Sequence, residues 1–325
     1  MLPPDLERLA DAQGGVFTAD QARRHGFDVA RPRRAGALTV VRRHVYACTQ
    51  TLAGLGTAEA VAAHASARLL VTAGDLVASH ATAAAMHGFA LLRAAPAEPQ
   101  LTEARRPGPM LRRAGVAISS LPAGHRDSVR GVALTSRVRT LADCARTLPA
   151  PAAVATADNT LRAGVSRSEV LAVLDGCGHW PGVQTAREVV RFADARADSP
   201  LESGTRWLLS RQGLPAPDLQ RTICDAFGRD VADVDMVWLE HRTVLETDGR
   251  LKYTAPEALW REKRREDALR LLGFEVVRGY WADLADDCHG LAARIRQAFA
   301  LNAARAQLPP YCHREKADRI EQRQR

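Results

Sequence analysis

Four acidic side chains on two neighbouring segments are the residues best placed to do chemistry. Asp233 and Asp235 alternate along one β-branched segment, and Glu246 and Asp248 alternate along the next. Because side chains of a strand alternate between its two faces, each pair shares a face. A short turn joins the two segments, so pairing them brings Asp235 close to Glu246 and Asp248. Such carboxylates repel one another unless protons or a divalent cation neutralise them, and the pattern therefore predicts a Mg²⁺ site.

These acids require a sheet that holds two strands side by side. The apolar periodicity and the capping residues predict a helix at 199–212, strands at 219–224, 231–239 and 243–248, a charged helix at 256–272, a strand at 274–277 and a last helix at 284–301. This order is typical of a mixed sheet between helices. A polar stretch at 195–200 predicts the boundary before this unit.

The residues around the acids resemble the PD-(D/E)XK nuclease superfamily, and most closely its branch of uncharacterised domains related to the very-short-patch-repair endonuclease. The similar segments are 199–202 (SPLE), 234–238 (VDMVW), 245–253 (LETDGRLKY), 260–269 (WREKRREDAL) and 273–278 (GFEVVR). The resemblance covers about residues 199 to 300, and these segments lie between residues 199 and 278. The resemblance implies a restriction-endonuclease-like fold that hydrolyses DNA phosphodiesters.

The resemblance also assigns roles to three of the acids. Asp235 and Glu246 would ligate Mg²⁺ or Mn²⁺, and Glu202 would approach the same metal directly or through water. The metal would activate water for in-line attack on phosphorus. Glu202 also has a purely structural interpretation, because it lies three residues after Ser199 and this spacing is that of a helix capping box.

The lysine of the superfamily motif is missing from its usual place. That position, two residues after Glu246, is occupied by Asp248, which only accepts hydrogen bonds when ionised and cannot replace a lysine. Lys252, or Lys263 from the following helix, is the candidate source of a cation for the phosphate. The other cations of that helix, Arg265 among them, are interpreted as a solvated face.

The first fifty residues predict a small DNA-binding unit. Helices are expected at 5–13, 19–25 and 29–35, and a hairpin at 38–46. The order of three helices followed by a hairpin is that of a winged helix-turn-helix.

Five arginines occupy the two places where such a unit contacts DNA. Arg31, Arg33 and Arg34 lie at the start of the third helix, and Arg42 and Arg43 lie in the wing. These five N-terminal arginines predict DNA binding. The alternative is a solvated basic face on a small helical domain.

Two N-terminal segments, 15–22 (GVFTADQA) and 42–46 (RRHVY), resemble the winged-helix domain of the abortive-infection type IV antitoxin family. Members of that family are transcriptional autorepressors that counter a nucleotidyltransferase-like toxin. The resemblance covers roughly the first fifty residues, and it implies DNA and such a toxin as partners.

The middle of the chain is less informative about function. Helices are predicted from residues 57, 79, 138, 166 and 180, and β-like runs at 116–119 and 132–135. His80 and His87 could share a helix face, but a metal site requires a third ligand, so both are interpreted as structural. The arginines between residues 105 and 139 are interpreted as solvated loop charge.

Composition limits the function classes. Lys and Arg number 45 against 37 Asp and Glu, but only three of these cations are lysine, and a GC-rich genome also produces an arginine excess. The net charge of +8 alone therefore does not establish nucleic-acid binding. No run approaches the roughly 20 apolar residues of a membrane span, and no secretory signal begins the chain, so a cytoplasmic protein without membrane contact is expected. The six cysteines are scattered singly, which fits neither a disulfide framework nor a thiolate zinc site.

We therefore predict an α+β protein in four parts. They are a winged helix-turn-helix at 1–50, an α/β middle region at 51–197, a PD-(D/E)XK endonuclease-like domain at 198–303 and a polar tail at 304–325. One predicted function is that of a DNA-binding, Mg²⁺-dependent endonuclease or nickase, in a phage-defence or toxin–antitoxin context. The alternative is an antitoxin-like autorepressor whose inactive nuclease-like domain serves for dimerisation or toxin contact.

Overall fold

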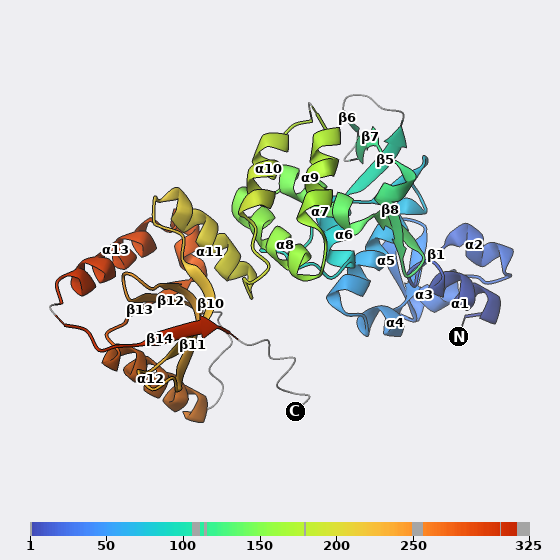
Figure 1. Ribbon diagram of the computed structural model, residues 1–325. Helices are drawn as coiled ribbons and strands as arrows, with labels where there is room; N and C mark the ends of the chain where they lie inside the picture. The colour runs from blue at the N-terminus through green and yellow to red at the C-terminus, as the bar shows by residue number, and fades with distance from the viewer. Residues whose placement is uncertain are drawn as a thin grey trace. The chain divides into compact units, whose positions relative to one another are not determined.

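The protein has an α+β fold in two compact units, Met1–Ala193 and Asp194–Arg325 (Figure 1). The computed structural model describes residues 2–105, 111–113, 116–178, 180–248, 256–305 and 307–316. Within these ranges no helix is both long and apolar enough to cross a membrane. Each unit contains helices and at least one sheet of its own, so each is described by itself.

The N-terminal unit begins with short helices and a small antiparallel sheet. Its first elements are α1 (Pro4–Asp11), β1 (Phe17–Thr18), α2 (Ala19–Arg24), α3 (Ala30–Arg34), β2 (Leu38–Arg42) and β3 (Val45–Cys48), with the strand order β1-β3-β2. Thr18 and Gln21 form a capping box that begins α2. The three predicted helices and the hairpin are confirmed. The predicted third helix is only five residues long, and none of its residues is buried.

The predicted boundary at residue 50 falls inside this packed unit. Val16 and Val45 share one apolar cluster with Ala63 and Ala67 of the helix α5 (Thr57–Leu69), which follows the short helix α4 (Thr49–Ala53). The Ser66 hydroxyl of α5 donates to the carbonyl of Gln13 at 2.6 Å. The N-terminal helices therefore continue directly into the middle region.

Within the described residues, the middle region contains a six-stranded sheet and five further helices. Its sheet has the order β6-β7-β5-β4-β9-β8, from β4 (Leu76–Ala78), β5 (Leu101–Arg105), β6 (Leu111–Arg113), β7 (Val116–Ser120), β8 (Arg126–Val129) and β9 (Val132–Thr135). The helices are α6 (His80–Met86), α7 (Arg137–Thr147), α8 (Ala150–Arg162), α9 (Arg167–Gly176) and α10 (Val183–Phe192). The predicted strands at 116–119 and 132–135 are present, whereas β4, β5, β6, β8 and α8 were not predicted.

The C-terminal unit has the predicted αβββαβ order. Its elements are α11 (Pro200–Arg211), β10 (Asp218–Cys224), β11 (Asp230–Trp238), β12 (Thr243–Asp248), α12 (Pro256–Leu271), β13 (Glu275–Tyr280) and α13 (His289–Ala303), with β14 (Cys312–Glu315) near the end. The strand order is β13-β12-β11-β10-β14, and only β12 and β13 pair in parallel. Segment 304–325, predicted as a polar tail, thus contributes a strand to this sheet.

Helices cover both faces of this sheet. Figure 1 shows α12 on one face and α11 and α13 on the other. Leu269 of α12 packs in one cluster with Val237 and Val244, whereas Leu291 of α13 lies beside Gly279 on the opposite face. Because both faces are covered, a polar side chain on these strands must find partners inside the protein or face an opening.

Candidate functional site

Asp235 lies where the strands β11 and β12 separate. Their antiparallel pairing runs from Trp238 opposite Thr243 to Met236 opposite Leu245 and goes no further. Beyond this point the Asp235 carboxylate bonds to β12 instead of the backbone. Its Oδ2 accepts hydrogen bonds from the backbone N–H of Thr247 at 3.1 Å and from the Thr247 hydroxyl at 3.3 Å. The side chain of Asp235 is thereby fixed at the point where the sheet opens.

Glu202 on α11 is almost completely buried, and its hydrogen-bond partner Gln220 lies opposite Asp235 in the register of β10 and β11. Glu202 is only 5% exposed. Burial, and then the charge of Asp235, raise the pKa of Glu202 from an ordinary 4.5 to about 7. Its Oε2 accepts from the N–H of Asp198 and from Nε2 of Gln220, both at 2.9 Å. Glu202 also takes part in the start of the helix, where the hydroxyl of Ser199 accepts from its N–H.

Glu246 makes its contacts on the α12 face of the sheet. Its Oε1 accepts from Nη1 of Arg265 at 2.8 Å, and the same nitrogen donates to the carbonyl of Asp233 at 3.0 Å. The neighbouring Thr247 lies on the α13 face, where its methyl group approaches Gly279. Alternation along β12 thus directs Glu246 away from the face on which Asp235 meets Thr247. Among the side chains that the structure describes, no group of three or more His, Cys, Asp or Glu is placed to hold a metal ion.

The remaining acids and lysines of the predicted site are placed as follows. The Asp233 carboxylate accepts from the Thr222 hydroxyl at 2.7 Å. Asp248 ends β12, with its backbone opposite Tyr280, but its side chain and the whole of Lys252 lie outside the described residues. Lys263 is exposed on α12, and its Nζ lies 5.9 Å from the centre of the Trp260 ring.

Two residues that were not predicted from the sequence are linked to Glu202, Gln220 directly and Lys316 through Gln220. Gln220 of β10 donates to Glu202, and the Nζ of Lys316 donates to Oε1 of Gln220 at 2.7 Å. Lys316 is separated from Gln220 by 96 positions. Neither residue belongs to a local pattern, so only the pairing of β14 with β10 reveals the contact.

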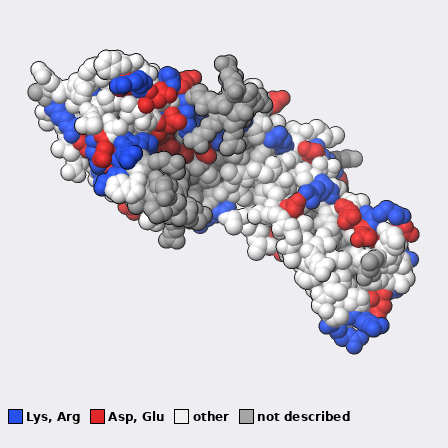
Figure 2. Space-filling view, turned by 90° about the horizontal axis from the view of Figure 1, so that it is seen from below, with Lys and Arg blue, Asp and Glu red and all other residues white. Residues whose placement is uncertain are grey.

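The five N-terminal arginines occupy the surface of their unit. Arg31, Arg33 and Arg34 are exposed on or beside the short helix α3. In the hairpin Arg43 is exposed, whereas Arg42 forms an ion pair with Glu98 at 3.1 Å. In the view of Figure 2, basic and acidic side chains lie side by side over this unit. Four of the five predicted DNA contacts thus have no ion pair among the described side chains, and the fifth has one.

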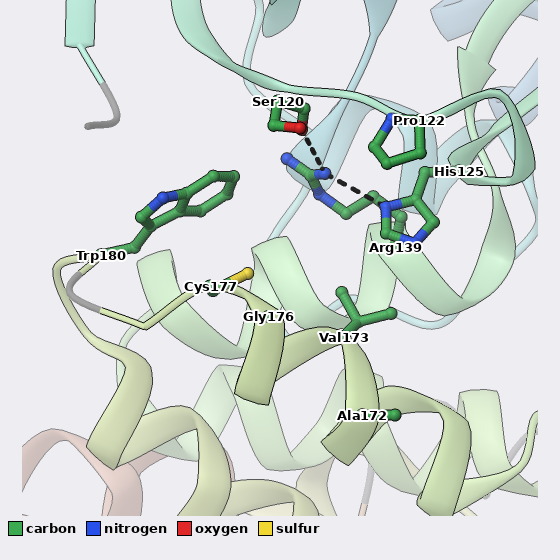
Figure 3. Close-up of a pocket in the computed structure, with 9 residues that line it drawn as sticks. All are labelled: Ser120, Pro122, His125, Arg139, Ala172, Val173, Gly176, Cys177 and Trp180. Atoms are coloured by element: carbon green, nitrogen blue, oxygen red, sulfur yellow. Dashed lines mark hydrogen bonds between the residues drawn. The ribbon is translucent and has the colours of Figure 1, made fainter. Parts of the chain in front are cut away.

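A pocket of about 310 Å³ lies in the N-terminal unit, between the loop after β7, α7 and α9 (Figure 3). Arg139 forms its floor: Nη1 donates to the carbonyl of Ser120 at 2.9 Å and points toward Nδ1 of His125 at 3.4 Å. The ring of Trp180 forms one wall, 5.0 Å from the Arg139 guanidinium carbon. Burial, and then the charge of Arg139, lower the pKa of His125, so its ring is neutral at pH 7.

The buried charges behind this pocket correct the interpretation of Arg139 as solvated loop charge. Arg139 is 2% exposed, and its Nε donates to Oδ2 of Asp143 at 2.9 Å. Arg146 donates to the other oxygen of the same carboxylate at 3.2 Å. Because one carboxylate connects two guanidinium groups, we interpret this cluster as the structural centre of the helical part of the unit.

Comparison with known proteins places the chain in a family. It is 33% identical over 228 residues to each of two uncharacterised proteins of Mycobacterium tuberculosis, MT2308 of strain CDC 1551 / Oshkosh and Rv2248 of strain H37Rv. The aligned part covers 68% of this chain and 80% of each relative. No family model and no solved structure matches the chain. At this identity and coverage, the chain belongs to the same family as these two mycobacterial proteins.

Proposed function

We propose that this protein binds DNA and that its C-terminal unit is a nuclease-like domain that hydrolyses DNA phosphodiesters with Mg²⁺ or Mn²⁺. The observation that carries the proposal is that Gln220, which donates to the buried Glu202 carboxylate, lies opposite Asp235 in the register of β10 and β11, and that the charge of Asp235 acts on Glu202. The two carboxylates come from different elements: Glu202 is buried to 5% exposure, and Asp235 lies at the point where β11 and β12 separate.

The chemistry of these two carboxylates fits a divalent cation. The charge of Asp235 opposes ionisation of Glu202, and a hard cation with oxygen ligands would remove that repulsion. Glu202 and Asp235 would hold it, whereas Glu246, which points to the α12 face and pairs with Arg265, would lie outside this ligand set. The cation would supply an activated water and stabilise the leaving oxygen of the phosphodiester. The protein's own contribution is to orient the carboxylates, through Thr247 for Asp235 and through Gln220 for Glu202.

The five N-terminal arginines are the proposed DNA contacts. Arg31, Arg33 and Arg34 present guanidinium groups from one short helix, and Arg43 adds another from the hairpin. Such contacts to phosphates give an affinity that falls steeply with salt. We therefore expect Arg33→Ala with Arg34→Ala to weaken binding and to reduce the salt dependence by about one phosphate contact for each arginine that touches a phosphate.

Cleavage of supercoiled and linear DNA with Mg²⁺ or Mn²⁺ tests the enzymatic part. Wild-type protein is expected to nick or cut, and Asp235→Asn is expected to bind DNA equally well without cutting it. Purified protein that shifts DNA in gels and leaves every DNA form intact with both metals would refute the enzymatic proposal.

A second candidate function is supported by the ion pair between Glu246 and Arg265. The two side chains are 10% and 23% exposed, so a protein cation already neutralises one of the acids assigned to the metal. Asp248 also stands where the superfamily has its lysine. These features fit a DNA-binding autorepressor, resembling the antitoxin family, whose nuclease-like unit mediates dimerisation or contact with a nucleotidyltransferase-like toxin.

The two candidates differ in their response to the same substitution. The repressor is expected to bind its own promoter whether or not Asp235 is replaced, and to lose that binding when Arg33 and Arg34 are replaced. Promoter binding should be measured by fluorescence anisotropy for the wild type and both variants. Cleavage that depends on Asp235 would exclude the repressor with an inactive nuclease-like unit.

A further inference from the structure

Gln220 has a strained backbone in the middle of a strand. Its φ is +51°, a left-handed conformation that is unfavourable for a non-glycine residue. The pairing of β10 with β11 includes Leu219 and Arg221 but omits Gln220, which by that register lies opposite Asp235. Strain of this kind persists only where the surroundings hold the residue, and it concentrates at functional sites. The conformation therefore needs an explanation from the contacts of Gln220.

Gln220 is only 8% exposed, and its side-chain amide has a hydrogen-bond partner on each side. On one side Nε2 donates to Oε2 of Glu202 at 2.9 Å. On the other, Oε1 accepts from Nζ of Lys316 at 2.7 Å. The backbone N–H of Lys316 also donates to the carbonyl of Gln220 at 3.0 Å, which extends the β10–β14 ladder by one residue.

The chemistry of lysine fixes which way this amide points. An ammonium group has three donors and no acceptor, so only the amide oxygen can face Lys316. The NH₂ group must then face Glu202. Asp198 contacts both Glu202 and Lys316. Its N–H donates to Glu202, and its carboxylate lies 3.5 Å from the Lys316 ammonium.

We propose that Lys316 is a positioning residue of the carboxylate site: it sets the orientation of the Gln220 amide, which in turn holds the Glu202 carboxylate beside Asp235. The C-terminal strand β14, predicted as part of a polar tail, thereby becomes part of the site. The inference rests on the proposed function only for what the site binds. The orientation of the amide is a property of the protein alone.

The first experiment measures that orientation without metal or DNA. The full chain is labelled with ¹⁵N-glutamine, and the side-chain amide of Gln220 is identified by its loss in Gln220→Leu. We expect a shifted, slowly exchanging NH₂ pair in the wild type, an averaged pair in Lys316→Met, and restoration in Lys316→Arg, because arginine also only donates. An identical Gln220 signal in the wild type and in Lys316→Met would refute the proposal.

A control on the same strand separates positioning from loss of β14. Arg314 forms an ion pair with Asp230, and no contact joins its described side chain to Gln220. Arg314→Met is therefore expected to leave the Gln220 signal unchanged. Hydrogen exchange of residues 312–316 in each variant shows whether the strand stays paired. If Arg314→Met moves the Gln220 signal as much as Lys316→Met does, the effect belongs to the strand and the role of Lys316 is refuted.

The second experiment measures Mn²⁺ affinity by electron paramagnetic resonance. Residues that orient metal ligands typically change affinity by about 10–100-fold, so Lys316→Met is expected to weaken Mn²⁺ binding about 10-fold. The double variant Lys316→Met/Gln220→Leu is expected to be no weaker than Gln220→Leu, because Lys316 acts through Gln220. Wild-type protein without Mn²⁺ binding would refute the proposed function and leave the amide measurement to decide on Lys316. Mn²⁺ binding that is equal in the wild type and in Lys316→Met would refute the positioning role.

Discussion

The protonation of Glu202 should make the stability of the C-terminal unit depend on pH in an unusual direction. Its pKa is about 7 in the folded chain against an ordinary 4.5, so the folded state binds this proton more tightly than the unfolded state. The stabilisation is complete below pH 4.5 and is lost as the pH rises to about 7. A difference of about 2.5 pH units at 1.36 kcal/mol for each unit corresponds to roughly 3 kcal/mol. Because Glu202 is 5% exposed, solvent screening reduces this value little.

Glu202→Gln removes the titration and keeps the shape of the side chain. Its amide oxygen can still accept from Asp198 and Gln220, so the variant is expected to gain up to about 3 kcal/mol relative to the wild type between pH 4.5 and pH 8. Urea unfolding with EDTA, read by hydrogen exchange of β10 and β11, measures the free energy of unfolding of this unit separately from the other. Glu240→Gln, at an exposed turn, is the control. Equal pH dependence in the wild type and in Glu202→Gln would show that burial and the charge of Asp235 do not raise the pKa of Glu202.

Three further predictions follow from other contacts. Arg265→Met removes from the largely buried Glu246 carboxylate a charged hydrogen bond worth about 1.5–3 kcal/mol, so urea unfolding is expected to show a loss of about that size in the C-terminal unit. An unchanged free energy of unfolding would contradict a structural role for this ion pair. Asp143→Asn breaks a buried charge cluster and is expected to destabilise the N-terminal unit by about 3–5 kcal/mol in urea unfolding, whereas a loss below about 1 kcal/mol would contradict its central role. Cys224 and Cys312 lie opposite each other on β10 and β14, so hydrogen peroxide is expected to join them in a disulfide with release of two waters. Peptide mass mapping detects this disulfide, and Cys312→Ser is expected to abolish it.

The sequence predicted the C-terminal sheet well because its strands carry long, regular patterns. β10, β11 and β12 are six to nine residues long and end at clear turns, and α11 begins at a capping serine. The middle region was harder, because β4 and β6 have three residues each and cannot show an alternation. β14 is polar and fully exposed along its length, so burial gave it no signature in the sequence.

The candidate site was predicted in its residue types and less well in its contacts. Glu202 and Asp235 were placed together by resemblance, and burial followed by the charge of Asp235 raises the pKa of Glu202. The partner of Glu246 was not predicted, because Arg265 lies on a helix whose many charges suggest a solvated face. Strand alternation alone also implied one shared face for the acids. It fails where β11 and β12 stop pairing, since Asp235 then bonds to Thr247 across the gap.

Glu202 was interpreted both as a capping residue of α11 and as a metal ligand. The two roles are compatible, but the burial of Glu202 favours the second. Ser199 does cap α11, but the Glu202 carboxylate reaches past it to Asp198 and Gln220. A capping glutamate at a helix end is normally exposed, where its charge is solvated and interacts favourably with the helix dipole. Burying that charge beside a second carboxylate opposes folding at neutral pH. Capping alone gives no reason for this arrangement, whereas a ligand that neutralises both carboxylates does.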